Sequence, residues 1–130
     1  MNATRHEFCV RLDDNQLEEA SLCLLHTIIF HRTTGKYTGS DRGFQIGSVG
    51  FRDVNCKQLP LTYVMTESNK LHESVQEHVT QFVKQFNAGG SKVLNLEFFQ
   101  KKRGRFWTGE EHIPWEVWQI RFSFVTFFKK

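Results

Sequence analysis

The stretch Leu17-Glu-Glu-Ala-Ser-Leu-Cys-Leu-Leu-His-Thr-Ile-Ile-Phe-His31 decides the fold, because it predicts a long helix that is apolar almost all the way round. Its apolar positions recur at helical spacing: Leu17, Ala20, Leu24 and Ile28, widened by Leu25 and Ile29. Asp13 and Asp14 can cap its start, and Thr33-Thr34-Gly35 is a stop signal. We expect a central helix over residues 15–31, covered on more than one side.

The remaining elements indicate a sheet and a second helix. Alternating apolar residues predict strands over residues 6–12, 61–65, 94–98 and 118–124, with bulged or hairpin-forming strands over 44–55. A helix over residues 69–86, capped by Thr66 or Ser68, has one apolar face and ends at Asn87-Ala88-Gly89-Gly90. The last two strands flank a loop over 101–114 and should form a long antiparallel hairpin. The fold class is therefore α+β, with helices packed on an antiparallel or mixed sheet.

Length and composition narrow the class of protein. The 130 residues suffice for one domain, over residues 1–130, but not for two. With 39% hydrophobic and 24% charged residues the chain is globular rather than disordered. Its net charge of +3 is mild, so we expect no nucleic-acid partner. The N-terminus carries early charges and no long apolar run, which excludes a signal peptide and indicates a cytoplasmic protein.

Reactive side chains give little support to an enzyme. Cys9, Cys23 and Cys56 are odd in number and widely spaced, which is typical of free, buried thiols rather than a disulfide framework or zinc site. Cys23 and His26 lie three apart on the first helix and could act as the nucleophile and base of a hydrolase, but an apolar environment raises the pKa of a thiol. No phosphate-binding loop or nucleophile elbow occurs. We expect no catalytic residue, metal site or cofactor.

The segment from Gln100 to Gly109 is the one unusual surface. Four basic residues precede two adjacent aromatic ones: Lys101, Lys102, Arg103 and Arg105, then Phe106 and Trp107. Three interpretations are open: a charged hairpin end with the aromatic rings in the core, a nucleic-acid contact over residues 101–107, or an exposed aromatic finger for a protein or membrane headgroups. Burial would draw the flanking charges toward the core, so exposure of Phe106 and Trp107 is favoured.

Several stretches together resemble one known family. They are Leu17–Tyr37, Ile46–Gly50 with Asp53–Cys56, Thr62–Val64, Leu96–Lys102 and Ile113–Trp118. In this order and spacing they resemble the autophagy-related protein 101 family of HORMA-domain proteins. The most specific piece is Ile113-Pro-Trp-Glu-Val-Trp118.

The resemblance implies a function and partners. The family is a set of non-enzymatic adaptors that bind and stabilise the HORMA domain of autophagy-related protein 13, within the kinase complex that initiates autophagy at the preautophagosomal site. A Trp-Pro-Phe finger recruits downstream factors; its positions fall here on Phe106, Trp107 and Thr108, so the aromatic pair is adjacent and in swapped order. By the same resemblance, the partner interface falls on Ile46, Val49 and Val54.

The resemblance also implies a HORMA-like fold with a further helix and C-terminal belt strands. This chain reaches Lys130, where those elements would follow, so it is expected to lack them. We therefore expect Phe122, Phe124 and Phe128 to lack their usual cover.

Overall fold

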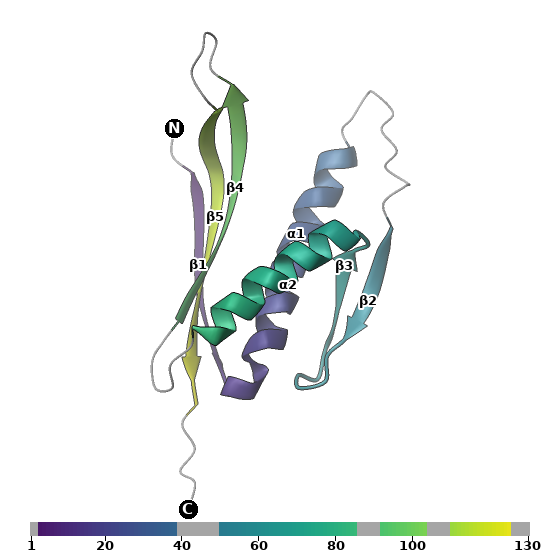
Figure 1. Cartoon of the computed structure of the whole chain (residues 1–130), viewed down its shortest axis with the longest axis vertical. Coiled ribbons are helices and arrows are strands. Elements are labelled where there is room, and N and C mark those ends of the chain that lie inside the picture. Colours follow the sequence, from purple (N-terminus) through teal and green to yellow (C-terminus); the bar gives the residue numbers. More distant parts are fainter. Residues whose placement is uncertain (1–2, 39–49, 86–91, 104–109, 126–130) are drawn as a thin grey trace, which may run out of the picture. The chain divides into compact units, whose positions relative to one another are not determined.

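The structure, a computed structural model, describes residues 3–38, 50–85, 92–103 and 110–125. The chain divides into two compact units, one made of residues 1–12 and 88–130 and the other of residues 13–87. The described part of the first unit consists of strands, and that of the second contains both helices and strands (Figure 1). The predicted α+β class is confirmed.

The first unit is a three-stranded mixed sheet with the order β1-β5-β4. Its strands are β1 (Thr4–Leu12), β4 (Lys92–Arg103) and β5 (Glu110–Phe124). The central strand β5 runs parallel to β1, from Thr4 opposite Glu116 to Leu12 opposite Phe124, and antiparallel to β4 (Figure 1). The long β4–β5 hairpin was predicted, and the parallel partner of β5 was not.

Phe122 corrects one expectation about the end of the chain. Its side chain is fully buried, at 0% exposure, as is that of Ile120 two residues earlier on β5. Phe124 is half-buried, and Phe128 lies outside the described residues. The expectation that Phe122 lacks cover was therefore wrong.

The β4–β5 pairing also extends further than the predicted loop over 101–114. Residues 101–103 pair with residues 110–112: Lys101 with His112, Lys102 with Glu111 and Arg103 with Glu110. These positions lack the apolar alternation by which strands are recognised in a sequence. The backbone of these residues is nevertheless paired, so the prediction of a loop at these residues was wrong.

The second unit places α1 (Leu17–Thr38) at its centre. A 3₁₀ turn, η1 (Asp14–Gln16), precedes this helix, and the hairpin of β2 (Phe51–Asn55) and β3 (Thr62–Thr66) and the helix α2 (Asn69–Lys84) follow it. α1 packs against both β3 and α2 (Figure 1), which confirms that it is covered on more than one side. The apolar core of the unit consists of Leu17, Ala20, Leu25, Ile28, Met65, Val75 and Val79.

The helix ends show where local signals succeed and fail. Ser68 caps α2, because its Oγ accepts a hydrogen bond of 3.3 Å from the Leu71 N–H. The alternative cap, Thr66, lies in β3. α1 continues through Thr33-Thr34-Gly35 to Thr38, so the predicted stop was wrong. Thr and Gly lower helix propensity by only about 1 kcal/mol or less each, which does not by itself end a helix.

Candidate functional site

The predicted aromatic finger lies between the two strands of the β4–β5 hairpin. Phe106, Trp107 and the neighbouring Arg105 fall in residues 104–109, outside the described residues. The flanking strands are paired up to Arg103 and Glu110, which lie opposite each other. The segment is therefore attached to a regular ladder of backbone hydrogen bonds rather than to a long loop.

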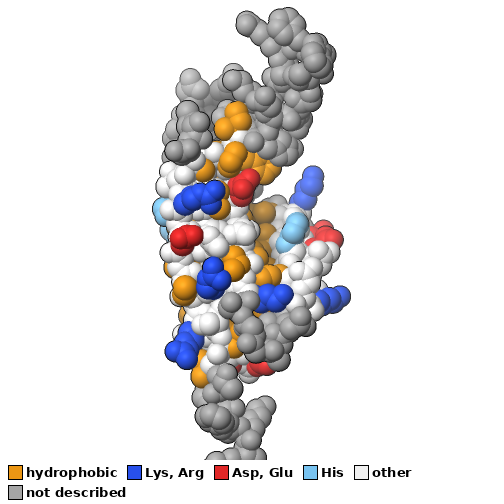
Figure 2. All heavy atoms as spheres, turned by 90° about the vertical axis from the view of Figure 1, so that its left-hand side faces the viewer, with side chains coloured by type: hydrophobic (Ala, Val, Ile, Leu, Met, Phe, Trp, Pro, Cys, Tyr) orange, Lys and Arg blue, Asp and Glu red, His pale blue; other side chains and the backbone are white. Residues whose placement is uncertain are grey.

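The predicted basic patch has acidic neighbours. The backbone register sets Lys102 across from Glu111 and Arg103 across from Glu110. Figure 2 shows Lys and Arg side chains spread over the face that it displays, with acidic and hydrophobic side chains between them. Nucleic-acid affinity depends on a concentrated positive field, and acidic residues in register with the basic ones weaken such a field.

A β-bulge at Trp115 creates a feature that we did not predict. The register shifts between Phe98, opposite Glu116, and Phe99, opposite Pro114, which makes Trp115 the extra residue on β5. A bulge re-aims the side chain of the strand that carries it. The Trp115 side chain is 45% exposed, and its ring lies 5.4 Å from that of Phe98 between centroids. Pro114 was the feature of the sequence that could have indicated this bulge, because proline within strands is found at bulges and edges.

Glu116 follows the bulge and holds a buried carboxylate. The Trp118 Nε1–H donates a hydrogen bond of 2.9 Å to its Oε1, and the His6 Nε2 lies 3.5 Å from its Oε2. The rings of His6 and Trp118 stack with centroids 4.1 Å apart. These contacts join the beginning of β1 to β5, so the Trp-Glu-Val-Trp stretch anchors the parallel strand pair.

In the second unit, the predicted partner residues are only partly described. Ile46 and Val49 lie outside the described residues, and Val54 is a half-buried residue of β2, opposite Tyr63. On the same strand Phe51 is 65% exposed, and the edge of its ring meets Phe30 with centroids 6.1 Å apart. Phe51 was not among the predicted site residues.

Glu19 fastens the β2–β3 turn to the start of α1. Its Oε2 accepts a hydrogen bond of 2.5 Å from the Lys57 N–H, and its Oε1 accepts one of 2.6 Å from the Gln58 N–H. The bond from the Lys57 amide is the largest cause that lowers the pKa of this carboxyl. The hairpin that carries Val54 and Phe51 is thereby held at its turn.

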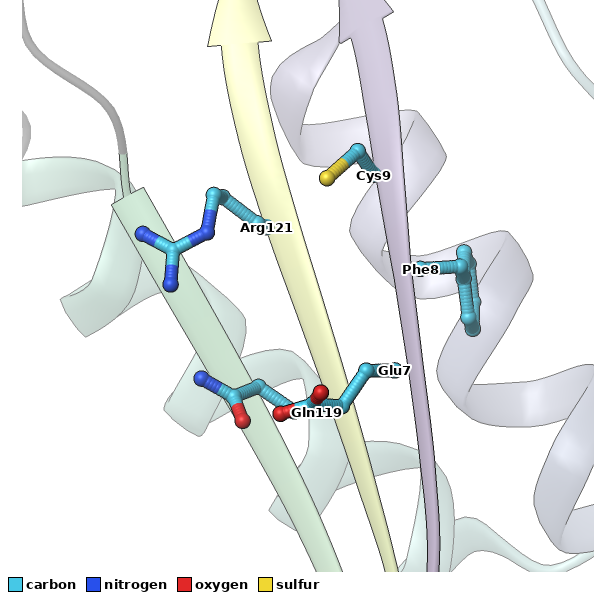
Figure 3. A pocket seen from close by; sticks show the side chains of 5 residues that line it. All are labelled: Glu7, Phe8, Cys9, Gln119 and Arg121. Carbon is cyan, nitrogen blue, oxygen red and sulfur yellow. The ribbon is translucent and has the colours of Figure 1, made fainter.

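A hollow of about 160 Å³ lies on the β1–β5 pair (Figure 3). Glu7, Cys9, Gln119 and Arg121 line it together with Phe8, which points to the other side of β1 (Figure 3). Ligand pockets commonly measure about 300–1,000 Å³, so this hollow is smaller than a typical ligand site. The three cysteines are free, as predicted, but Cys9 is exposed rather than buried. A short strand with one solvent-facing side places alternate residues outside the core.

The family is decided by a comparison with known sequences. The sequence profile described as autophagy-related protein 101 matches residues 9–129 of the chain. The chain belongs to the autophagy-related protein 101 family. This confirms the resemblance stated from the sequence.

Individual relatives agree with the profile. The autophagy-related protein 101 of Xenopus tropicalis is 38% identical over 130 residues, which cover 97% of this chain and 60% of the relative. That of Homo sapiens is 38% identical over 129 residues, covering 96% and 59%. That of Arabidopsis thaliana is 23% identical over 118 residues, covering 88% and 49%. The chain spans about 60% of the length of its vertebrate relatives.

The side chains that were weighed as catalytic do not form a nucleophile–base pair. Burial raises the pKa of the Cys23 thiol and lowers the pKa of His26 to about 4. His72 is half-buried and stacks on His26, whereas His78 is exposed and its Nδ1 lies 2.8 Å from the Ser74 carbonyl. Within the described residues, no group of three or more His, Cys, Asp or Glu side chains could hold a metal ion. No helix in that part of the chain is long and apolar enough to cross a bilayer.

Proposed function

We propose that the chain is a non-enzymatic adaptor of the autophagy-initiation kinase complex, built on a HORMA-like domain over residues 1–130. It binds and stabilises the HORMA domain of autophagy-related protein 13 and recruits downstream factors, or membrane headgroups, through Phe106 and Trp107. It acts in the cytoplasm and at the preautophagosomal site. The observation that carries this proposal is the family match over residues 9–129.

The β4–β5 hairpin supports the recruiting role of the aromatic pair. Its strands are hydrogen-bonded as far as Arg103 and Glu110, so residues 104–109 connect two paired strand ends. Exposed aromatic residues beside arginine are frequent anchors at protein interfaces. Trp115 and Phe99, with 45% and 38% of their surfaces exposed, add aromatic area on the same hairpin.

The alternative function, a small nucleic-acid-binding domain that uses residues 101–107, has weaker support. The register sets Glu110 and Glu111 opposite Arg103 and Lys102, and the formal net charge of the chain is only +3. A nucleic-acid complex that depends on phosphate contacts loses affinity steeply as salt rises. Binding to single-stranded RNA or DNA at micromolar strength, with that salt dependence, would favour the alternative.

The aromatic finger is tested by changing Phe106→Ala and Trp107→Ala together. We expect recruitment of downstream factors by the preassembled heterodimer to fall at least tenfold, because a buried aromatic anchor contributes about 2 kcal/mol or more to an interface. The free energy of unfolding and the affinity for autophagy-related protein 13 should stay unchanged. The readouts are a pull-down with the purified heterodimer and a urea titration.

Phe51→Ala provides the matched control, because Phe51 is an exposed aromatic residue of the other unit. It should leave recruitment intact. If the double variant unfolds at markedly lower urea, its rings belong to the core. If it recruits normally, the downstream function lies elsewhere.

A further inference from the structure

His26 is buried in the middle of the second unit. Its side chain is 1% exposed, and among the described residues neither Nδ1 nor Nε2 has a hydrogen-bond partner. The ring is approached from two elements packed on α1: Tyr63 of β3, at 6.1 Å between centroids and 11° between planes, and His72 of α2, at 6.0 Å and 20°. An unpaired buried imidazole costs stability, so its retention at this position calls for a physical explanation.

The surroundings of His26 tolerate only its neutral form. A protonated imidazole has two N–H donors and a full charge, and no described residue accepts a hydrogen bond from either nitrogen. The groups that face the ring are His72 from α2, Arg52 from β2 and Tyr63 from β3, and the first two are cations when charged. Burial raises the pKa of Tyr63 to about 12, so the phenol is neutral and supplies no negative charge. The buried Nδ1 of His72 is also without a partner.

We propose that His26 is a proton-operated switch: its protonation separates α1 from β3 and α2 and opens the helical unit at acidic pH. Protonation is disfavoured in the closed unit, where the charge would be buried and repelled by Arg52 and His72. The proton can be accommodated once the ring reaches water. This inference goes beyond the adaptor function, because the switch belongs to the chain alone and needs no partner.

The direction of the effect follows from linkage. Burial first, and then His72 and Arg52, lower the pKa of His26 from 6.5 to about 4. The opened unit therefore binds more protons than the closed one between these values. The contribution of the neutral His26 ring to the free energy of opening is fully present above about pH 6.5. It is lost as the pH falls toward 4. For one such group, the opening constant, which is the equilibrium ratio of opened to closed unit, rises roughly 20-fold as the pH falls from 7 to 5.

Hydrogen exchange of the α1 amides measures this opening directly. After correction for intrinsic exchange rates, we expect the opening constant of the amides around His26 to rise roughly 20-fold from pH 7 to pH 5 in the full 130-residue chain. His26→Phe keeps an aromatic ring between Tyr63 and His72 and removes the titrating group, so its opening constant should stay flat. His78→Gln is the matched control, because His78 is an exposed histidine of α2, and it should behave as the wild type.

A second measurement does not depend on any variant folding. In an NMR titration of the wild-type chain, the His26 ring resonances should remain those of a neutral imidazole down to about pH 5. A His26 that titrates near 6.5 in the folded chain would overturn the proposal. So would a pH dependence of α1 exchange that persists in His26→Phe.

Discussion

Glu116 illustrates how a buried polar residue is retained in an apolar sheet. Its carboxylate is 5% exposed and accepts the Trp118 indole N–H, while His6 lies at its other oxygen. A buried donor that loses its acceptor costs more than the hydrogen bond itself contributed. The acidic residue in Trp-Glu-Val-Trp is therefore a packing element of the β1–β5 pair, a role that the sequence alone did not reveal.

Glu116→Ala should lower the free energy of unfolding by about 2 kcal/mol, because the N–H of the half-buried Trp118 loses its acceptor. Glu116→Gln retains an oxygen acceptor and should cost less. Urea titrations of the two variants at pH 7 provide the comparison. An equal loss in both would mean that the charge facing His6, and not the indole hydrogen bond, makes the larger contribution.

Among the elements, those with a strong apolar period were predictable and those formed by polar residues were not. β1, β3 and α2 start within two residues of the predicted positions, because their alternation or helical stripe is regular. The paired ends of the hairpin, Lys101–Arg103 and Glu110–His112, were missed because charged residues carry no hydrophobic period. The parallel pairing of β1 with β5 was missed for another reason: strand order depends on contacts between distant segments, which no local pattern encodes.

The contribution of the Ser68 cap to the stability of α2 can be tested by substitution. Ser68→Ala should lower the free energy of unfolding by about 1 kcal/mol, because the Leu71 N–H at the first turn loses its side-chain acceptor. Ser74→Ala places the same substitution at an exposed position inside the same helix, where alanine has the better propensity, and it should be neutral or slightly stabilising. Thermal unfolding followed by circular dichroism distinguishes the two. Equal behaviour would show that Ser68 is not the effective cap.

For the whole molecule, the family was readable from the sequence, and much of the candidate site was not. The motif from Ile113 to Trp118 identifies the family, yet its local structure, a bulge with an exposed Trp115, follows only from the pairing of β5 with β4. Of the predicted partner residues, the structure describes Val54, in a hairpin held by Glu19. Their role as an interface remains a prediction.

Addition of the HORMA domain of autophagy-related protein 13 should stabilise the chain in proportion to its concentration. A ligand that binds only the folded state contributes about 2.7 kcal/mol at one hundred times its dissociation constant. Ile46→Asp combined with Val49→Asp should abolish this stabilisation, because it places two charges in the proposed apolar interface. The measurement is the thermal midpoint over a series of partner concentrations.

Asn55→Asp is the control for this pair, because it adds a negative charge at an exposed position of β2. It should retain the stabilisation by the partner. A midpoint that is independent of partner concentration in the wild-type chain would contradict the heterodimer.

The parallel pairing of β1 with β5 has a consequence for the order of events on the ribosome. Thr4 emerges before its partner Glu116, which follows on the order of ten seconds later at usual rates of synthesis. Residues 13–87 are synthesised in between and form a contiguous unit, so the helical unit can close first. The sheet has high contact order, and its completion is the slow step. Until then β1 is a nascent strand with unpaired edges, which can pair with other chains.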